Sequence, residues 1–247
     1  MDKNILIVGG SSAIAVACAR EWIKYGANFM LAGRQATRLE SVAQDLRVRG
    51  AGRVATFLLD VNDFGQHRTM LDSALAELGR IDIVLLAHGT LSDQSECERD
   101  PQAAVREITV NALSTIALLT LLADVFEAQK SGSIAVISSV AGDRGRPSNY
   151  VYGTAKAAVT TFCEGLRARL FKSNVKVLTI KPGFVDTPMT AGLALPAPLV
   201  ASPQRVATDI VRAVERGKDL LYTPWFWAEI MLVIRSLPSF VFKRISL

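Results

Sequence analysis

The chain has 247 residues, of which 50% are hydrophobic and 21% are charged. These proportions fit one folded domain with a substantial core, and they argue against a long disordered segment. Lys and Arg number 28 against 23 Asp and Glu, which gives a formal net charge of +5 without any long basic run. This argues against nucleic acid as a partner, whereas an anionic cofactor, an anionic substrate or a membrane surface would each suit the mild positive charge.

The cysteines and the first residues bear on the compartment. Cys18, Cys97 and Cys163 are odd in number and widely spaced, without the spacing of metal ligands. We therefore expect buried thiols, with neither a disulfide nor a metal site. A strand-like segment at 4–8 starts the chain, and no signal peptide precedes it, so we expect a cytoplasmic protein.

Apolar strand-like runs alternate with amphipathic segments along the chain. Such alternation predicts parallel strands joined by right-handed helical crossovers. We therefore predict an α/β fold of the Rossmann type, a doubly wound, seven-stranded parallel sheet with helices on both faces. It forms a single domain over 1–223, with an apolar and basic C-terminal extension at 224–247. Strands are expected near 4–8, 28–32, 53–58, 81–86, 132–138, 175–180 and 219–223, and helices near 13–25, 36–49, 64–78, 102–129, 149–172 and 203–216.

The turn between the first strand and the first helix is rich in glycine and serine. A turn of this composition holds a pyrophosphate against the N-terminus of the following helix, through backbone N–H groups and hydroxyls. We therefore expect it to bind a dinucleotide. The residues predicted to do so are Gly9, Ser11, Ser12 and Ile14.

The second strand ends at Gly33, where an acidic residue would bind the adenosine ribose, and Arg34 follows. A guanidinium at this place suits a 2′-phosphate through charge-assisted hydrogen bonds. We therefore predict NADP(H) rather than NAD(H), with Arg38 one turn further on as an assisting residue. The alternative is that both arginines are solvated charges at the start of a helix.

Two histidines and an aspartate follow in chain order. Asp60 ends the third strand, where its side chain could cap the helix near 64. His67 is expected on the surface of that helix. His88 lies in the loop after the fourth strand, and we interpret it as structural rather than catalytic.

The apolar run at 134–137 ends in Ser138 and Ser139, as expected of a buried parallel strand that carries hydroxyls at its carboxyl end. Tyr152 and Lys156 are four residues apart on the next predicted helix and share one of its faces. A nearby ammonium lowers the pKa of a phenol, and a serine hydroxyl donates to a carbonyl oxygen as negative charge builds there. Together these groups would protonate a ketone or, in reverse, deprotonate an alcohol.

The serine, the Tyr-x-x-x-Lys pair and the glycine-containing turn together resemble the short-chain dehydrogenase/reductases. The spacing in that family selects Ser139 as the carbonyl-orienting residue. The resemblance implies that Tyr152 is the acid and that Lys156 lowers its pKa and binds the ribose. It also implies that Asn111 distorts its helix and holds a water in a relay to Lys156.

The same resemblance implies the remaining cofactor contacts. Asp60 and Val61 would contact the adenine, and Gly89 would lie beside the cofactor. The Pro-Gly turn and its downstream threonine would hold the nicotinamide carboxamide through Pro182, Gly183, Val185 and Thr187. The sequence departs from the family where Ala13 and Ala15 replace glycines, and where Leu86, Ala87 and His88 replace two asparagines and an alanine.

Three further segments suggest where a substrate binds. Residues 188–202 are apolar, as expected of a mobile lid over an apolar substrate. Arg144 and Arg146 follow Ser139 closely and would either bind a substrate phosphate or lie in a solvated turn. The segment 225–247 joins aromatic and apolar residues to basic ones, which suits either an interfacial membrane contact or a subunit interface.

The stretches at 138–146, 151–156 and 234–238 also resemble the decaprenylphosphoryl-2-keto-pentose reductases, which reduce a keto-sugar on a polyprenyl phosphate. This implies a lipophilic carbonyl substrate. We separately expect a homodimer or homotetramer, cytoplasmic or associated with the cytoplasmic face of a membrane. A fatty or steroid ketone reductase is the alternative enzyme. A non-catalytic protein that senses NADP(H) is the alternative of another class.

Overall fold

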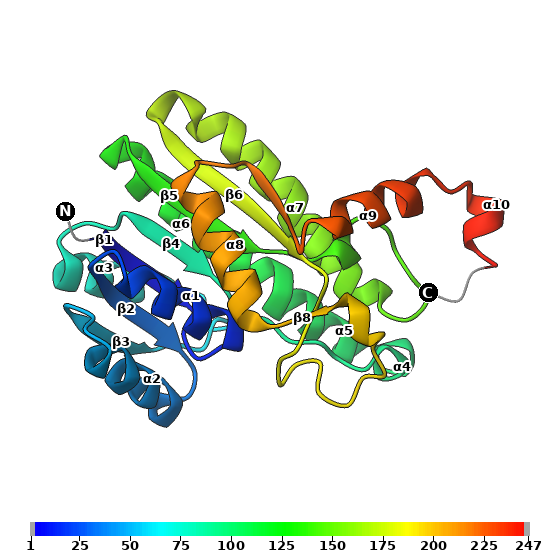
Figure 1. Cartoon of the computed structure of the whole chain (residues 1–247), viewed down its shortest axis with the longest axis horizontal. Coiled ribbons are helices and arrows are strands. Elements are labelled where there is room, and N and C mark those ends of the chain that lie inside the picture. Colours follow the sequence, from blue (N-terminus) through cyan, green and yellow to red (C-terminus); the bar gives the residue numbers. More distant parts are fainter. Residues whose placement is uncertain (1–2, 245–247) are drawn as a thin grey trace.

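The structure is a computed structural model that describes residues 3–244, built around a parallel sheet of seven strands in the order β3-β2-β1-β4-β5-β6-β9 (Figure 1). Every neighbouring pair is parallel. The predicted fold class is therefore confirmed. The strands are Lys3–Val8 (β1), Ala27–Gly33 (β2), Val54–Leu58 (β3), Ile83–Leu86 (β4), Gly132–Ile137 (β5), Val175–Pro182 (β6) and Leu220–Thr223 (β9).

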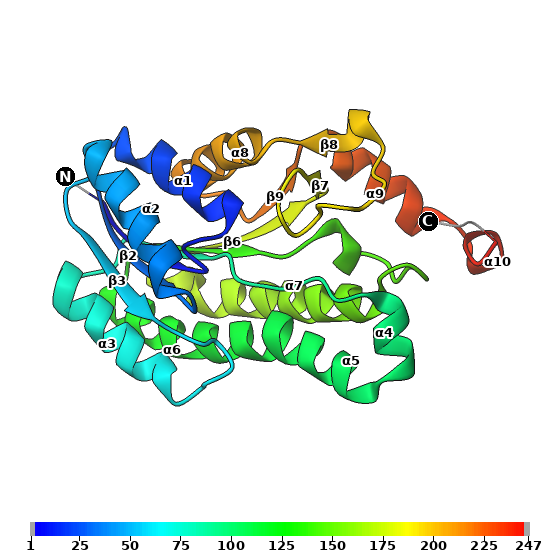
Figure 2. The ribbon, with the colours of Figure 1, turned by 90° about the horizontal axis from the view of Figure 1, so that it is seen from below.

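Helices cover both faces of the sheet, so that its central strands are buried on both sides (Figure 2). This explains why they are continuous apolar runs rather than alternating ones. One layer holds α1 (Ala13–Ile23), α2 (Ala36–Val48) and α8 (Pro203–Glu215), and the other holds α3 (Gln66–Leu78), α6 (Ser114–Gln129) and α7 (Tyr150–Leu170). All three cysteines are buried and free, as predicted.

The long helix predicted near 102–129 is interrupted. It consists of α5 (Pro101–Ile108), a π-helical turn (Thr109–Leu113) and α6, and a short helix that was not predicted, α4 (Gln94–Arg99), precedes it. The stretch 101–129 is long and apolar enough to span a bilayer by length and composition alone. Leu118, Leu122 and Phe126 are instead buried in the core beneath the sheet, which accounts for its apolar character.

The strand order reverses between β1 and β4, because the chain winds outward from β1 in one direction and from β4 in the other. In doubly wound sheets a crevice opens at such a point, outside the carboxyl ends of the strands. The first glycine-containing turn, the loop after β4 and the loop after β5 all lie at this edge.

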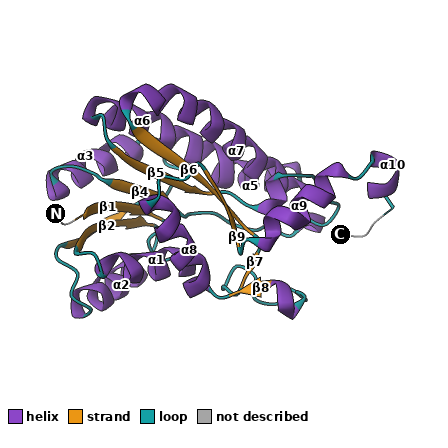
Figure 3. Cartoon of the chain, turned by 45° about the horizontal axis from the view of Figure 1, so that its top comes forward, coloured by secondary structure: helices purple, strands orange, loops and turns teal. Residues whose placement is uncertain are grey.

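The C-terminal part adds elements beyond the predicted ones. A small parallel sheet pairs β7 (Phe184–Val185) with β8 (Val200–Ala201). Two helices, α9 (Phe226–Ser236) and α10 (Ser239–Phe242), follow β9 at the carboxyl edge, and α10 projects beyond the main layers (Figure 3). Helix α9 packs back onto the domain through Trp227 and Met231. Residues 245–247 of the predicted extension lie outside the described residues.

Candidate active site

Ser139, Tyr152 and Lys156 meet at the carboxyl edge of the sheet. Ser139 lies two residues after the end of β5, and its side chain is hydrogen-bonded to that of Tyr152 near the start of α7. The Lys156 Nζ lies 5.5 Å from the centroid of the Tyr152 ring and donates to the carbonyl of Ile137 at 3.1 Å. The structure thus brings the three groups predicted for proton transfer into one place.

Close packing of the β5–α7 loop against α7 creates this arrangement. A Cβ on Gly142 would lie 2.7 Å from the carbonyl carbon of Lys156, and one on Gly153 would lie 2.7 Å from the carbonyl oxygen of Ala141. Both glycines are therefore required for the loop to lie directly on the helix. The sequence analysis did not identify these two positions.

The two neighbouring serines have different environments. Ser138 is 1% exposed, and its Oγ donates to the carbonyl of Lys156 at 2.9 Å and contacts the Thr160 hydroxyl at 2.8 Å. It therefore joins strand to helix. Ser139 is partly exposed beside Tyr152 and accepts from the Ala141 N–H at 3.1 Å. Of the two, Ser139 is the one that is both partly exposed and hydrogen-bonded to Tyr152.

Burial dominates the electrostatics of the pair. It raises the pKa of Tyr152 to about 12, although the hydrogen bond from Ser139 lowers it. Burial also lowers the pKa of Lys156 to about 8. The expected lowering of the Tyr152 pKa by Lys156 is thus not found in this structure, because desolvation of the phenolate outweighs the favourable contacts.

Asn111 lies in the π-helical turn, so the predicted distortion of its helix is present. Its Oδ1 accepts from the Thr90 N–H at 3.2 Å. A Cβ on Gly89 would lie 2.6 Å from that Oδ1 and 3.6 Å from the Lys156 Nζ. Asn111 and Lys156 therefore flank Gly89. Only glycine fits there, because any larger residue would place a side chain against both of them.

Glu107, which the sequence analysis overlooked, is buried one turn before Asn111 and is 1% exposed. Its carboxylate accepts from the hydroxyls of Thr90 and Ser92 at 2.7 and 2.5 Å, and from the Asn111 Nδ2 at 2.9 Å. An acidic residue four positions before Asn111, on the same face of the predicted helix, was the available signal.

Both histidines are buried or partly buried and serve the fold. His67 is fully buried, with its Nε2 2.9 Å from the carbonyl of Val61, so the expectation of a surface residue was wrong. The His88 Nε2 lies 3.0 Å from the Ser114 hydroxyl and 3.1 Å from that of Thr115. Burial, followed by the charge of Lys156, lowers the pKa of His88 to about 3 and keeps the ring neutral.

The turn after β1 has the features of a phosphate cradle. Gly9 has a φ of +82°, and a Cβ there would lie 2.5 Å from the backbone nitrogen of His88. The Ser12 side chain caps α1 by accepting from the Ala15 N–H, and Ser11 and Ile14 flank it partly exposed. Ala15 is fully buried in the core and Ala13 begins the helix, so the Ala15 methyl packs inward, away from the crevice.

A hollow of about 380 Å³ adjoins this turn, lined by Ser11, Thr37, Arg38, Ser41 and Val42. Arg34 and Arg38 are both exposed, and neither forms an ion pair within residues 3–244. Hydroxyls and unpaired guanidiniums beside a helix N-terminus are the donors that a phosphate monoester requires. The residues present therefore fit the phosphorylated ribose of NADP(H).

Asp60 and Val61, predicted to contact the adenine, lie two and three residues after the end of β3. Asp60 is exposed at the strand end, and Val61 is partly exposed beside it. The Asp60 Oδ1 accepts from the Asn62 N–H at 3.0 Å, whereas the N-cap of α3 is Gly65. The suggestion that Asp60 caps that helix was therefore wrong, and a cofactor contact is its remaining predicted role.

The Pro-Gly turn predicted to face the nicotinamide ends β6. Pro182 is buried in the strand, and Val185 pairs with β8. The Thr187 N–H donates to the Thr190 hydroxyl at 3.2 Å, so Thr190 holds this turn. A Cβ on Gly183 would lie only 1.9 Å from the indole of Trp227, so α9 packs directly against the turn.

The predicted lid and arginines have different surroundings. Met189 and Leu193 are about half exposed in the apolar segment. Arg144 donates to the carbonyls of Ile234 and Leu237, the latter at 2.7 Å, and covers the ring of Phe242 at 3.8 Å. It therefore joins the C-terminal helices to the catalytic loop rather than lying in a solvated turn, and its binding of a substrate phosphate stays a prediction.

Arg146 has the free donor that binding of a substrate phosphate would require. It is 7% exposed, its Nε has no hydrogen-bond partner, and it forms no ion pair with any described residue. Burial lowers its pKa. The nearby carboxylate of Asp143 is bound instead by Lys181, at 2.5 Å, and by the Tyr222 hydroxyl, at 2.6 Å.

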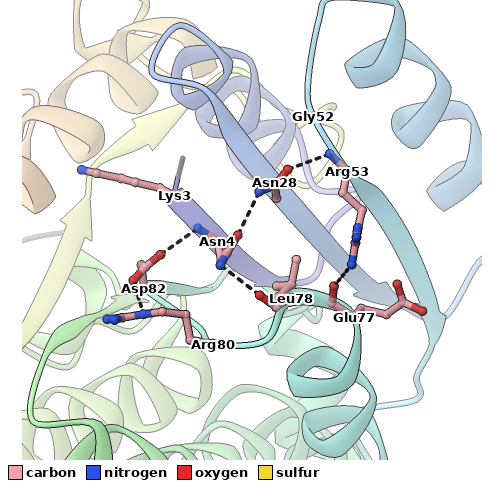
Figure 4. A pocket seen from close by; sticks show the side chains of 9 residues that line it. All are labelled: Lys3, Asn4, Asn28, Gly52, Arg53, Glu77, Leu78, Arg80 and Asp82. Atoms are coloured by element: carbon pink, nitrogen blue, oxygen red, sulfur yellow. Dashed lines mark hydrogen bonds and ion pairs between the residues drawn. The ribbon is translucent and has the colours of Figure 1, made fainter. Parts of the chain in front are cut away.

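A larger hollow, of about 1100 Å³, lies at the amino edge of the sheet (Figure 4). Its polar side chains other than Glu77 are already bonded within the protein. The Asn28 Nδ2 donates to the Asn4 Oδ1 at 3.0 Å, the Asn4 Nδ2 donates to the Leu78 carbonyl, and the Arg80 guanidinium pairs with Asp82. The size of this hollow therefore does not make it a candidate site.

Comparisons with known proteins agree with this geometry. Residues 3–196 match the family described as short chain dehydrogenase. An uncharacterised oxidoreductase of Mycobacterium tuberculosis is 40% identical over 97% of this chain and 96% of its own, and one of Streptomyces coelicolor is 34% identical over 98% and 96%. The 3-oxoacyl-[acyl-carrier-protein] reductase FabG of Chlamydia muridarum is 29% identical over 84% and 88%. The crystal structure of gox2181 has a TM-score of 0.83 at 19% identity over 93% and 97%, which shows a shared fold.

Proposed function

Since the chain belongs to the short-chain dehydrogenase family and is an oxidoreductase, we propose that it reduces a ketone to a secondary alcohol with NADP(H). The observation that carries this proposal is the meeting of Ser139, Tyr152 and Lys156 beside the glycine-containing turn. The alternative of a non-catalytic sensor is disfavoured, because sensing a dinucleotide requires no phenol hydrogen-bonded to a serine next to a buried ammonium.

The cofactor, when bound, supplies a hydride to the carbonyl carbon. The Ser139 hydroxyl donates to the carbonyl oxygen and stabilises the charge that builds there. The Tyr152 hydroxyl gives its proton to that oxygen, and the Lys156 ammonium stabilises the phenolate that remains. Asn111 holds the relay through which a proton returns to the pair.

The preference for NADP(H) rests on the cationic environment of the predicted 2′-phosphate. Arg34 and Arg38 lie exposed beside the hollow, without a carboxylate partner in the described part of the chain. The test is steady-state reduction of a ketone panel with NADPH and with NADH. A higher kcat/KM with NADPH is expected, and equal values would contradict the preference.

We propose a substrate that combines a keto-sugar, a phosphate and a lipid, as in a polyprenyl-phosphate keto-pentose. Arg146 supports the phosphate, because its buried guanidinium forms no ion pair with a described residue and its Nε has no hydrogen-bond partner, so that a ligand anion would offset the cost of burying it. Exposed Met189 and Leu193 support the lipid. Turnover of a polyprenyl-phosphate keto-pentose should exceed that of short soluble ketones, and equal preference would count against this substrate.

A second candidate substrate is a fatty or steroid ketone. The same exposed apolar side chains suit it, and the relative from Chlamydia muridarum is named as a 3-oxoacyl reductase. The two candidates differ in their need for Arg146. Arg146→Met should reduce kcat/KM for a phosphorylated substrate and leave that for a neutral fatty or steroid ketone unchanged.

We also propose that α9 and α10 rest on an anionic membrane surface at the cytoplasmic face. Trp225, Leu232, Val233 and Phe240 are each more than 60% exposed, and the basic Arg235, Lys243 and Arg244 lie among them. This pairing suits an interfacial helix. Co-sedimentation with vesicles of phosphatidylglycerol, but not of phosphatidylcholine, is expected, and Leu232→Asp should abolish it.

The protein is further proposed to assemble as a homodimer or homotetramer. Val105, Leu113 and Phe171 are about half to three-quarters exposed on the outer helical layer, where a second copy would cover them. Sedimentation equilibrium should give the mass of a dimer or a tetramer, and the mass of a monomer would contradict the proposal. If Leu232→Asp dissociates the oligomer and leaves vesicle binding unchanged, α9 is a subunit interface rather than a membrane contact.

A further inference from the structure

Glu107 is a buried charge that the proposed reaction has not used. It is 1% exposed, yet no Lys, Arg or His forms an ion pair with it in the described part of the chain. Three donors bind its carboxylate instead: the Thr90 and Ser92 hydroxyls and the Asn111 amide. An apolar residue here would avoid the cost of burying a charge, so the packing of α5 does not explain a carboxylate.

The carboxylate fixes which way Asn111 faces. A carboxylate only accepts hydrogen bonds, so it must face the Nδ2 end of the amide, which also lies 3.2 Å from the Thr90 hydroxyl. The Oδ1 end is thereby turned toward Gly89 and the Thr90 N–H. Glu107 thus holds Asn111 and the loop at 89–92 in one arrangement beside the Lys156 ammonium.

The charge of Glu107 also acts on the catalytic pair. Its negative charge opposes the effect of burial on Lys156 by raising the pKa of that lysine, and it raises the pKa of Tyr152 as well. The other titratable groups facing this region are Cys97 on α4, whose pKa is raised chiefly by burial, and His88, which is neutral. Arg106, next to Glu107 in α5, is directed instead to Asp100.

We propose that Glu107 is a positioning residue of the active site: it orients Asn111 and keeps Lys156 cationic at the pH of turnover. The inference rests on the proposed function. Reduction requires protonated Tyr152 and cationic Lys156, and Glu107 favours the protonated form of both. Removing its charge should therefore move the alkaline limit of reduction to lower pH.

Two substitutions separate the geometry from the charge. In Glu107→Gln the amide oxygen can still accept from Asn111 while its NH₂ donates to the two hydroxyls, so the arrangement survives without the charge. In Glu107→Leu both the hydrogen-bonded arrangement and the charge are lost. Glu96→Gln on α4 is the matched control, because its side chain is 57% exposed and lies outside the site.

The first measurement needs no turnover. NMR titration of isotopically labelled lysine side chains, with the Lys156 signal assigned through Lys156→Arg, should show the Lys156 pKa near 8 in the parent protein. In Glu107→Gln we expect it lower by about one unit. An unchanged Lys156 titration would overturn the charge role.

The second measurement is the pH profile of kcat/KM for ketone reduction. Its alkaline limit should shift down by about one unit in Glu107→Gln with little change in KM, whereas Glu107→Leu should also lose roughly a hundred-fold in kcat through misplacement of Asn111. A parent-like profile in Glu107→Gln would overturn the proposal even if Glu107→Leu fails to fold. If the parent protein reduces no ketone, the proposed function fails, and the lysine titration still decides what Glu107 does.

Discussion

The two edges of the sheet use similar residues for opposite purposes. At the amino edge, Asn4 and Asn28 bond to each other, and Arg53 and Arg80 are bonded to neighbouring groups of the chain (Figure 4). At the carboxyl edge, Arg34 and Arg146 have no ion-pair partner among the described residues. Polar groups satisfied by the protein stabilise it, whereas polar groups left unsatisfied at a crevice are available to a ligand. Substitutions at the amino edge should therefore reduce stability, and most of those at the carboxyl edge should reduce activity.

The largest effect is expected from Tyr152→Phe. It removes the proton donor and preserves the ring, so reduction should fall about 10³-fold while the unfolding midpoint and cofactor binding stay close to those of the parent protein. Single-turnover kinetics measure the rate of reduction, and thermal unfolding measures the unfolding midpoint. Tyr150→Phe, an exposed tyrosine on the same helix, is the control and should remain active. Retained turnover in Tyr152→Phe would contradict its assignment as the acid.

His88 should make stability depend on pH, although it lies at the carboxyl edge. Its pKa is about 3 when folded, against 6.5 unfolded, so only the unfolded chain gains this proton between those values. The stability it confers is complete above pH 6.5 and declines as the pH falls toward 3, by up to about 1.4 kcal/mol per unit. Urea unfolding of the parent and of His88→Gln at pH 7 and pH 5 should show a smaller loss in the variant. An equal loss would assign the dependence to other groups.

Asn28→Ala tests the amino edge. It removes the acceptor of the Arg53 N–H, 2.7 Å away, and the donor to Asn4. The free energy of unfolding should fall by about 1–2 kcal/mol, because partners are left without hydrogen bonds. The measurement is urea unfolding, with kcat/KM determined on the same sample. A change in kcat/KM without a loss of stability would break the distinction between the two edges.

Arg34→Ala should have the smallest effect. Loss of one charge-assisted contact to the 2′-phosphate should raise the KM for NADPH by about tenfold, leave that for NADH unchanged and leave the unfolding midpoint in place. Arg49→Ala, at the far end of the same helical segment, provides the control for a simple change of net charge. Equal changes in the KM for NADPH and for NADH would show that Arg34 does not bind the 2′-phosphate.

The sequence by itself determined the class of fold. Alternation of apolar runs and amphipathic segments is imposed by strands buried on both faces, and it identified all seven strands of the main sheet. It also marked the serines at the end of the fifth strand, Tyr152 and Lys156, because helical periodicity and the end of a strand are local properties, whereas the family resemblance selected Ser139 over Ser138. The break in the helix at Asn111 was expected through the family resemblance rather than through periodicity.

Only the tertiary structure decided which polar residues are bonded within the protein. Arg144 and Arg146 are two residues apart. Arg144 donates to a carbonyl of helix α9, about ninety residues further along the chain, whereas the Nε of Arg146 has no hydrogen-bond partner among the described residues. In the same way, the burial of His67 and the hydrogen bonds of Glu107 depend on groups from other segments. Sequence patterns report the environment that a residue's own element creates, whereas hydrogen-bond partners and desolvation come from whatever the fold packs against it.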